Sequence, residues 1–148
     1  MRIPISLRKE HEELLSMLER AMATPGEVGE AAQVVFDLLM PHFHREEEFA
    51  LPQLGSLSLS GEGKVERPER IIELTDQLRE ELPRMLEEHV QIAIALESLQ
   101  AAAESAGLEE HVKFADMLLL HAQMEEEVLY PASLLIGSYV KRSLVTQA

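Results

Sequence analysis

HFHREEEFALP, residues 42–52, recurs later in the chain as HAQMEEEVLYP, residues 121–131. Each copy places a His and a Glu four residues apart, adds two further acids, and ends on a Pro ten residues after the His. On an α-helix, residues four apart lie on one face, about 6 Å from each other along the axis. The imidazole and the carboxylate of each copy could therefore bind one metal ion or two adjacent ions.

The repeat extends beyond these eleven residues. His11 and His89, each preceded by a Glu, form a second matching pair at nearly the same offset, and similar apolar residues surround both. The distance along the chain from His11 to His42 is also nearly the same as that from His89 to His121. The pattern predicts two helical hairpins, at about residues 5–52 and 82–131, each with one isolated His and one His-x-x-x-Glu pair.

The composition favours a helical globule. Of the 148 residues, 46% are apolar, whereas aromatic residues make up only 4%. We therefore expect an all-α fold, an up-down antiparallel four-helix bundle with a short C-terminal helix, in a single domain that spans residues 1–148. In such a bundle, the facing side chains of the helices can build a metal site.

The connections are predicted from Gly and Pro. Residues 53–67 hold three glycines and read as a long loop, and a lead-in helix follows up to about residue 81. Pro83 is expected to divide the helical stretch of residues 68–105, because proline removes a backbone hydrogen bond. Pro131 is expected to mark a break before a C-terminal helix at about residues 132–144.

The charge and composition exclude several classes of function. The formal net charge is −14, so a nucleic-acid partner is not expected, and the chain has no cysteine for a disulfide, a thiolate zinc site or an iron–sulfur cluster. No apolar run reaches the ~18 residues that a membrane span requires. The first residues lack the apolar stretch of a signal peptide, and we expect a cytoplasmic protein.

The repeated positions combine into one predicted metal cluster, formed by His11, His42, Glu46, His89, His121 and Glu125. Four imidazoles with two carboxylates suit iron, manganese or zinc better than magnesium or calcium. Two ions roughly 3.5–4 Å apart could share both carboxylates, with two His for each ion. Open coordination positions would remain, and dioxygen, a peroxide or a substrate could occupy them.

Simpler interpretations exist for each element alone. A single His-x-x-x-Glu is usually a surface ion pair, and a single His on an apolar stripe is usually a core residue. The repetition of all four elements at matched offsets favours the metal site. Four neighbouring acids are candidates for outer or exchangeable ligands: Glu12, Glu47, Glu88 and Glu126. We expect His44 and His111 at the surface and Tyr130 in a purely structural role.

Taken in order, the motifs resemble the hemerythrin-like HHE cation-binding domains over about residues 5–137. The resemblance rests on His11 within Glu-His-Glu-Glu-Leu, on His42-x-x-x-Glu46, on Glu-His89, and on His121-x-x-x-Glu125-Glu-Glu-Val-Leu-Tyr-Pro. It implies a four-helix bundle around a non-haem di-iron centre that binds or reacts with dioxygen. Two departures separate the chain from the oxygen carriers, namely Ala93 in place of a third-helix His, and Glu125 in place of an Asp one residue later. The ligand set is more similar to that of iron-sensing and bacterial members.

Three functions remain open at this point. The first is a di-iron protein that binds or responds to dioxygen, nitric oxide or peroxide, in sensing or handling iron and oxygen. The second is an enzyme with the same centre, a ferroxidase or a peroxide-decomposing protein. The third is an acidic helical interaction module with zinc or without metal. The sequence assigns no catalytic residue, no organic cofactor and no oligomeric state.

Overall fold

The computed structural model describes residues 2–56, 65 and 67–147, and these residues are almost entirely helical. Among them are five α-helices: α1 (Ile5–Met22), α2 (Glu27–Arg45), α4 (Pro68–Ala106), α5 (Glu109–Met124) and α6 (Tyr130–Gln147). Three short turns accompany them: the π-helical η1 (Glu46–Ala50), the 3₁₀-helical η2 (Pro52–Ser56) and the π-helical η3 (Glu125–Leu129).

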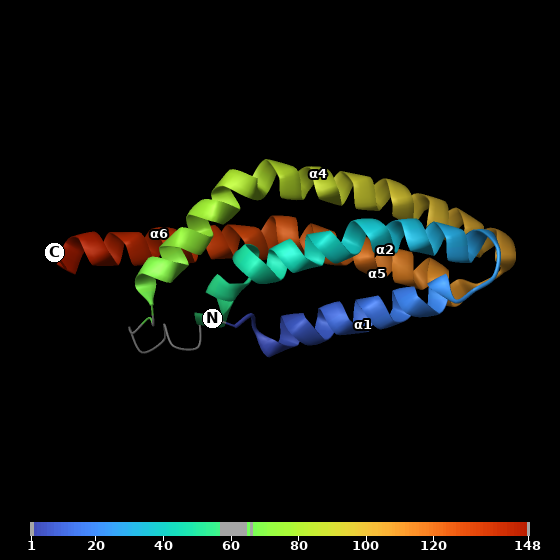
Figure 1. The fold of residues 1–148 in the computed structure, drawn as a ribbon, viewed down its shortest axis with the longest axis horizontal. Coiled ribbons are helices and arrows are strands. Elements are labelled where there is room, and N and C mark those ends of the chain that lie inside the picture. Colours follow the sequence, from blue (N-terminus) through green and yellow to red (C-terminus); the bar gives the residue numbers. More distant parts are fainter. Residues whose placement is uncertain (1, 57–64, 66, 148) are drawn as a thin grey trace.

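The predicted antiparallel four-helix bundle is confirmed. Helices α1, α2 and α5 and the second half of α4 lie along one another in alternating directions (Figure 1). The α1–α2 and α4–α5 connections lie at one end of this bundle, and both termini point toward the other. Helix α6 and the first half of α4 extend beyond the four helices and pack against each other.

Glycines form both hairpin connections. Gly26 precedes α2 with a φ of 86°, and Gly107 follows α4 with a φ of 70°. Glycine adopts this left-handed region without a Cβ penalty. After α4, the backbone N–H of Leu108 donates to the carbonyl of Ala103 at 2.9 Å, a bond that satisfies one of the free carbonyls at the helix end.

The buried apolar residues form two clusters with polar residues between them. One cluster fills the bundle toward the hairpin connections and includes Leu39 and Ile92. The other surrounds η1, η2 and the first half of α4 and includes Leu51 and Met85. On α4, His89 lies between Met85 of one cluster and Ile92 of the other. The predicted metal residues therefore occupy a polar layer between two apolar ones.

Two predicted helix breaks are wrong. Pro83 lies inside α4, which continues through all 39 residues and changes direction instead of ending (Figure 1). One lost hydrogen bond bends a helix but does not end it where both flanking segments pack on neighbours, as α4 does against α2 and α6. Of the predicted loop, residues 53–56 belong to η2, and residues 57–64 and 66 lie outside the described part of the chain.

Pro131 is the second predicted break that the structure contradicts. The chain continues without interruption from α5 through η3 into α6, so the C-terminal helix spans residues 130–147 and not 132–144. In η3 the backbone N–H of Tyr130 donates to the carbonyl of Glu125, five residues earlier, and Leu51 donates to Glu46 in the same way at 2.9 Å. Each Pro of the repeat thus lies two residues after the last residue of a π turn, a wider form of helix that the chain can continue through.

Helix α6 packs closely on α4 through Gly137. A Cβ at this position would overlap the side chain of Thr75, so only glycine permits this approach. Among the described residues, no helix has both the length and the apolar character that crossing a membrane requires.

Candidate metal centre

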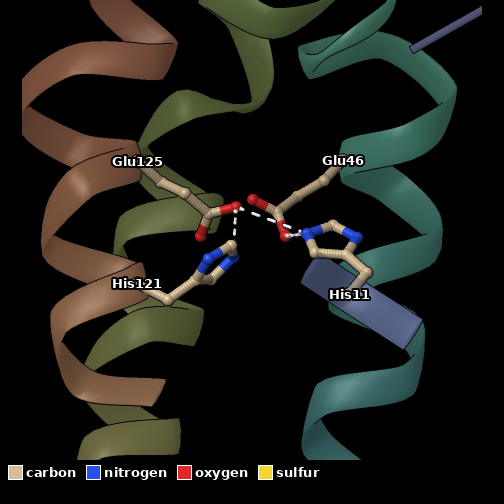
Figure 2. A group of neighbouring side chains, drawn as sticks. All are labelled: His11, Glu46, His121 and Glu125. Atoms are coloured by element: carbon tan, nitrogen blue, oxygen red, sulfur yellow. Dashed lines mark ion pairs between the residues drawn. The ribbon is translucent and has the colours of Figure 1, made fainter. Parts of the chain in front are cut away.

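The structure brings all six predicted residues together in the buried polar layer. His42 with Glu46, and His121 with Glu125, are one helical turn apart, because α2 and α5 run straight into the π turns. The side chains form two groups that share both carboxylates: His11, Glu46, His121 and Glu125 (Figure 2), and His42, Glu46, His89 and Glu125. Glu46 is 0% exposed and Glu125 is 1% exposed.

Each carboxylate faces imidazoles of both groups. Glu125 Oε1 lies 3.2 Å from His89 Nε2, and Glu125 Oε2 lies 3.3 Å from His121 Nε2. Glu46 Oε1 lies 3.5 Å from His42 Nε2 and 3.8 Å from His11 Nε2. These four nitrogens and the carboxylate oxygens therefore point into one shared volume.

Several of these buried atoms find no hydrogen-bond partner among the described residues. They are Nδ1 and Nε2 of His11, Nε2 of His121, Oε1 of Glu46 and Oε2 of Glu125. Burying a polar atom without a partner costs about 1–3 kcal/mol, and more for a charged group. A cation between the two carboxylates would satisfy these atoms together, and nitrogen with oxygen donors suits iron, manganese or zinc. The residues present fit a metal centre.

A carboxylate from another helix lies beside the outer nitrogen, Nδ1, of each imidazole. The pairs are His42 with Glu88 at 3.1 Å, His89 with Glu126 at 2.8 Å, His11 with Glu47 at 3.7 Å, and His121 with Glu10 in close contact. Glu47 is too far from His11 for a hydrogen bond, but in the other three pairs the carboxylate can accept from Nδ1, which orients the ring and leaves Nε2 available to a metal. This arrangement is the usual surrounding of a metal-binding histidine.

Of the four predicted outer acids, three lie beside an imidazole of the site. Glu47, Glu88 and Glu126 each approach an imidazole, whereas Glu12 is exposed and pairs with no described side chain. Glu10, which was not among the predicted acids, contacts His121. The repeat itself contains the missed signal, because Glu10 precedes His11 as Glu88 precedes His89.

Tyr130 was expected to have a purely structural role. The structure instead places it in the site. Its hydroxyl donates to Oε2 of Glu46 at 2.6 Å, and its side chain is 1% exposed. Tyr130 follows Glu125 by five residues, and on a regular α-helix it would point about 140° away from the Glu125 side chain. The π turn widens this step to about one full turn and brings Tyr130 back to the ligand face.

His111 is buried, although it was expected at the surface. It is 5% exposed, and its Nε2 lies 3.3 Å from the hydroxyl of Thr24 near the hairpin end of the bundle. It therefore belongs to the packing of that end and is no part of the metal-site groups. His44 is exposed, as expected.

The two central carboxylates differ in protonation. Burial and the adjacent Glu125 raise the pKa of Glu46 well above its usual range. Burial also acts to raise the pKa of Glu125, but contacts with Glu46 and the surrounding imidazoles lower it well below that range. Without a metal, the opposite shifts therefore favour a single proton shared by the two carboxylates.

The pKa values of the imidazoles also shift in opposite directions. Burial and the neighbouring His89 lower the pKa of His42 to about 3, so its ring is neutral. Burial opposes the charged form of His89 and of His121, but hydrogen bonds to carboxylates outweigh it and raise both pKa values. In the metal-free protein, His89 and His121 thus favour bound protons, which supply positive charge where a metal cation would otherwise supply it.

A surface groove reaches the site at His121. It lies between α1 and α5, has a volume of about 500 Å³, and includes Glu10 and His121 in its lining. Met117, Leu120 and Met124 form its apolar wall on α5. This groove connects the imidazole of one group with the protein surface.

Comparison with known protein families agrees with this geometry. A family model, the hemerythrin HHE cation binding domain, matches residues 4–133, which include all six residues of the two groups and Tyr130. Comparisons with curated proteins and with solved structures found no match. The match covers most of the chain, and the cluster is one that can hold metal ions. The chain therefore belongs to the hemerythrin family of HHE cation-binding domains.

Proposed function

We propose that this protein binds two iron ions and uses them to bind or respond to dioxygen or a related small molecule, such as nitric oxide or a peroxide. The observation that carries the proposal is the pair of buried groups, each with two His, that share Glu46 and Glu125. Six ligands for two ions leave coordination positions open. A role in iron or oxygen sensing or handling, in the cytoplasm, would use such positions.

Iron bound there would supply open coordination positions and electrons for a small oxygen species. The protein residues would do the remaining work. Outer carboxylates such as Glu88 and Glu126 orient the imidazoles through Nδ1. The apolar clusters on both sides of the layer exclude water, which strengthens every charge interaction inside it.

Anaerobic loading tests the proposal directly. We expect the chain to take up about two Fe(II), in line with a paired site, and to change its visible absorption when air is admitted. His42→Ala should lose this uptake, whereas His44→Ala should keep it, because His44 is exposed two residues away. Failure of the unsubstituted chain to bind Fe(II) in stoichiometric amounts would overturn the proposal.

The same preparation separates the alternatives. Repeated consumption of peroxide or of Fe(II) with dioxygen would identify an enzyme, whereas a single stoichiometric oxidation identifies binding or sensing. Retention of zinc with no response to air would favour the interaction module.

A further inference from the structure

The internal repeat is broken at the residues that line the metal centre. When the two copies are aligned with His42 on His121, Tyr130 of the second copy corresponds to Leu51 of the first, and Phe43 corresponds to Ala122. Tyrosine and phenylalanine thus each occur on one side only. The two halves of the site have similar ligands but different walls.

The two walls differ in chemistry. On one side, Phe43 stacks on the ring of His11, with the ring centroids 3.8 Å apart and the planes 3° from parallel. The phenyl ring of Phe43 has no hydroxyl and cannot donate a hydrogen bond. On the other side, the hydroxyl of Tyr130 lies 3.5 Å from His42 Nε2 and 3.3 Å from His89 Nε2. A hydrogen-bond donor therefore stands beside one group of imidazoles and not beside the other.

The two carboxylates also differ in how their oxygens are used. Glu125 points one oxygen toward each group, Oε1 toward His89 and Oε2 toward His121. Glu46 points Oε1 toward both groups, while its Oε2 accepts the hydrogen bond from Tyr130 at 2.6 Å. Oε2 of Glu46 is therefore held by Tyr130, whereas its Oε1 faces both groups without a hydrogen bond from a described residue.

We propose that Tyr130 makes the two metal positions unlike, and that a small anionic ligand binds at the His42–His89 position beside its hydroxyl. Because Tyr130 holds Oε2 of Glu46, this oxygen would be a weaker ligand, and an ion bound by His42 and His89 would keep room for an added ligand. The hydroxyl carries a single proton, so a ligand that enters beside it would accept that proton in place of Oε2 of Glu46. This inference rests on the proposed binding of two iron ions, but not on any particular role in sensing or turnover.

The chain contains a matched pair of variants for the test. Its two tyrosines are Tyr130, which is 1% exposed, and Tyr139, which is 63% exposed on α6. Tyr130→Phe removes the hydroxyl and keeps the ring in the core, and Tyr139→Phe makes the same chemical change far from the centre. Both variants and the unsubstituted protein are loaded with a Mössbauer-active iron isotope, and azide serves as the anionic probe.

The unsubstituted protein and Tyr139→Phe should each show two distinct iron signals of equal area. In Tyr130→Phe one of the two signals should shift, and the dissociation constant for azide, followed by visible absorption, should rise about tenfold, as expected for one lost hydrogen bond to a charged acceptor. A single iron signal in the unsubstituted protein would overturn the inference without any variant.

The remaining outcomes are also decisive. If Tyr130→Phe binds two iron ions with unchanged signals and unchanged azide affinity, the asymmetry does not come from Tyr130, and the proposed function still stands. If the unsubstituted chain fails to bind two iron ions, the proposed function fails, and this inference fails with it.

Discussion

Glu46 and Glu125 lie together at the centre of the bundle, although they come from opposite halves of the chain, and both are almost completely buried. Two carboxylates in one buried volume repel each other when both are ionised. Burial and this repulsion raise the pKa of Glu46, whereas contacts with Glu46 and the surrounding imidazoles lower the pKa of Glu125 despite its burial. Without a cation, burial of the pair therefore costs stability, because a proton must be taken up to avoid two buried charges.

Removal of one carboxylate should stabilise the metal-free protein. We expect Glu46→Gln to raise its free energy of unfolding by about 1–3 kcal/mol, because the amide keeps the acceptor for Tyr130 and is neutral without taking up a proton. The same variant should lose the increase in Tm that Fe(II) gives the unsubstituted chain. Denaturant and thermal unfolding with and without metal measure both effects, and Glu48→Gln, at an exposed position, should change neither. A metal-free Glu46→Gln protein less stable than the unsubstituted chain would refute this prediction.

Metal binding should release protons and weaken as the pH falls. The pKa values of Glu46, His89 and His121 are raised, so these groups bind protons that a cation must displace. His42, with a pKa of about 3, is already neutral and releases none at neutral pH. Calorimetry in buffers of different ionisation enthalpy counts the protons, and an affinity that stays constant from neutral to mildly acidic pH would contradict the assignment.

The outer carboxylates should influence affinity without binding metal themselves. Glu10→Gln and Glu88→Gln should each weaken metal binding by about 10–100-fold, because the amide oxygen that remains lacks the negative charge that strengthens the hydrogen bond from Nδ1. Glu12→Gln is the matched control, since Glu12 is exposed and is the neighbour of the same His11. Competition with a coloured chelator measures all three affinities. Equal affinities in Glu10→Gln and Glu12→Gln would remove Glu10 from the site.

Core packing on α4 should be separable from the metal centre. Leu99 is 0% exposed and lies ten residues after His89, about 15 Å along the helix axis. Leu99→Ala should lower the free energy of unfolding by about 2–5 kcal/mol. Ile94→Ala, on the same helix but 55% exposed, should change it by less than about 0.5 kcal/mol. Metal affinity at a temperature where both variants are folded should match that of the unsubstituted chain, and a large loss in Leu99→Ala would show that the two regions are coupled.

Local spacing made the helices and the six central residues predictable. His42 and Glu46 must share a face on any helix, and the repeat indicates that His121 and Glu125 have an equivalent environment. The predicted ends at Pro83 and Pro131 failed for a different reason. Whether a proline bends a helix or ends it depends on what the flanking residues pack against, and in this fold both flanks are packed.

By itself, the sequence determined the helical repeat, the hairpin pairing and the positions of the polar layer, because each depends on helical periodicity along a continuous segment. Only the tertiary structure decided that Glu10 and not Glu12 approaches His121, since that contact crosses between α1 and α5. It also decided the place of Tyr130. A π turn changes the rotation of every residue that follows it, and the direction in which Tyr130 points follows from that turn.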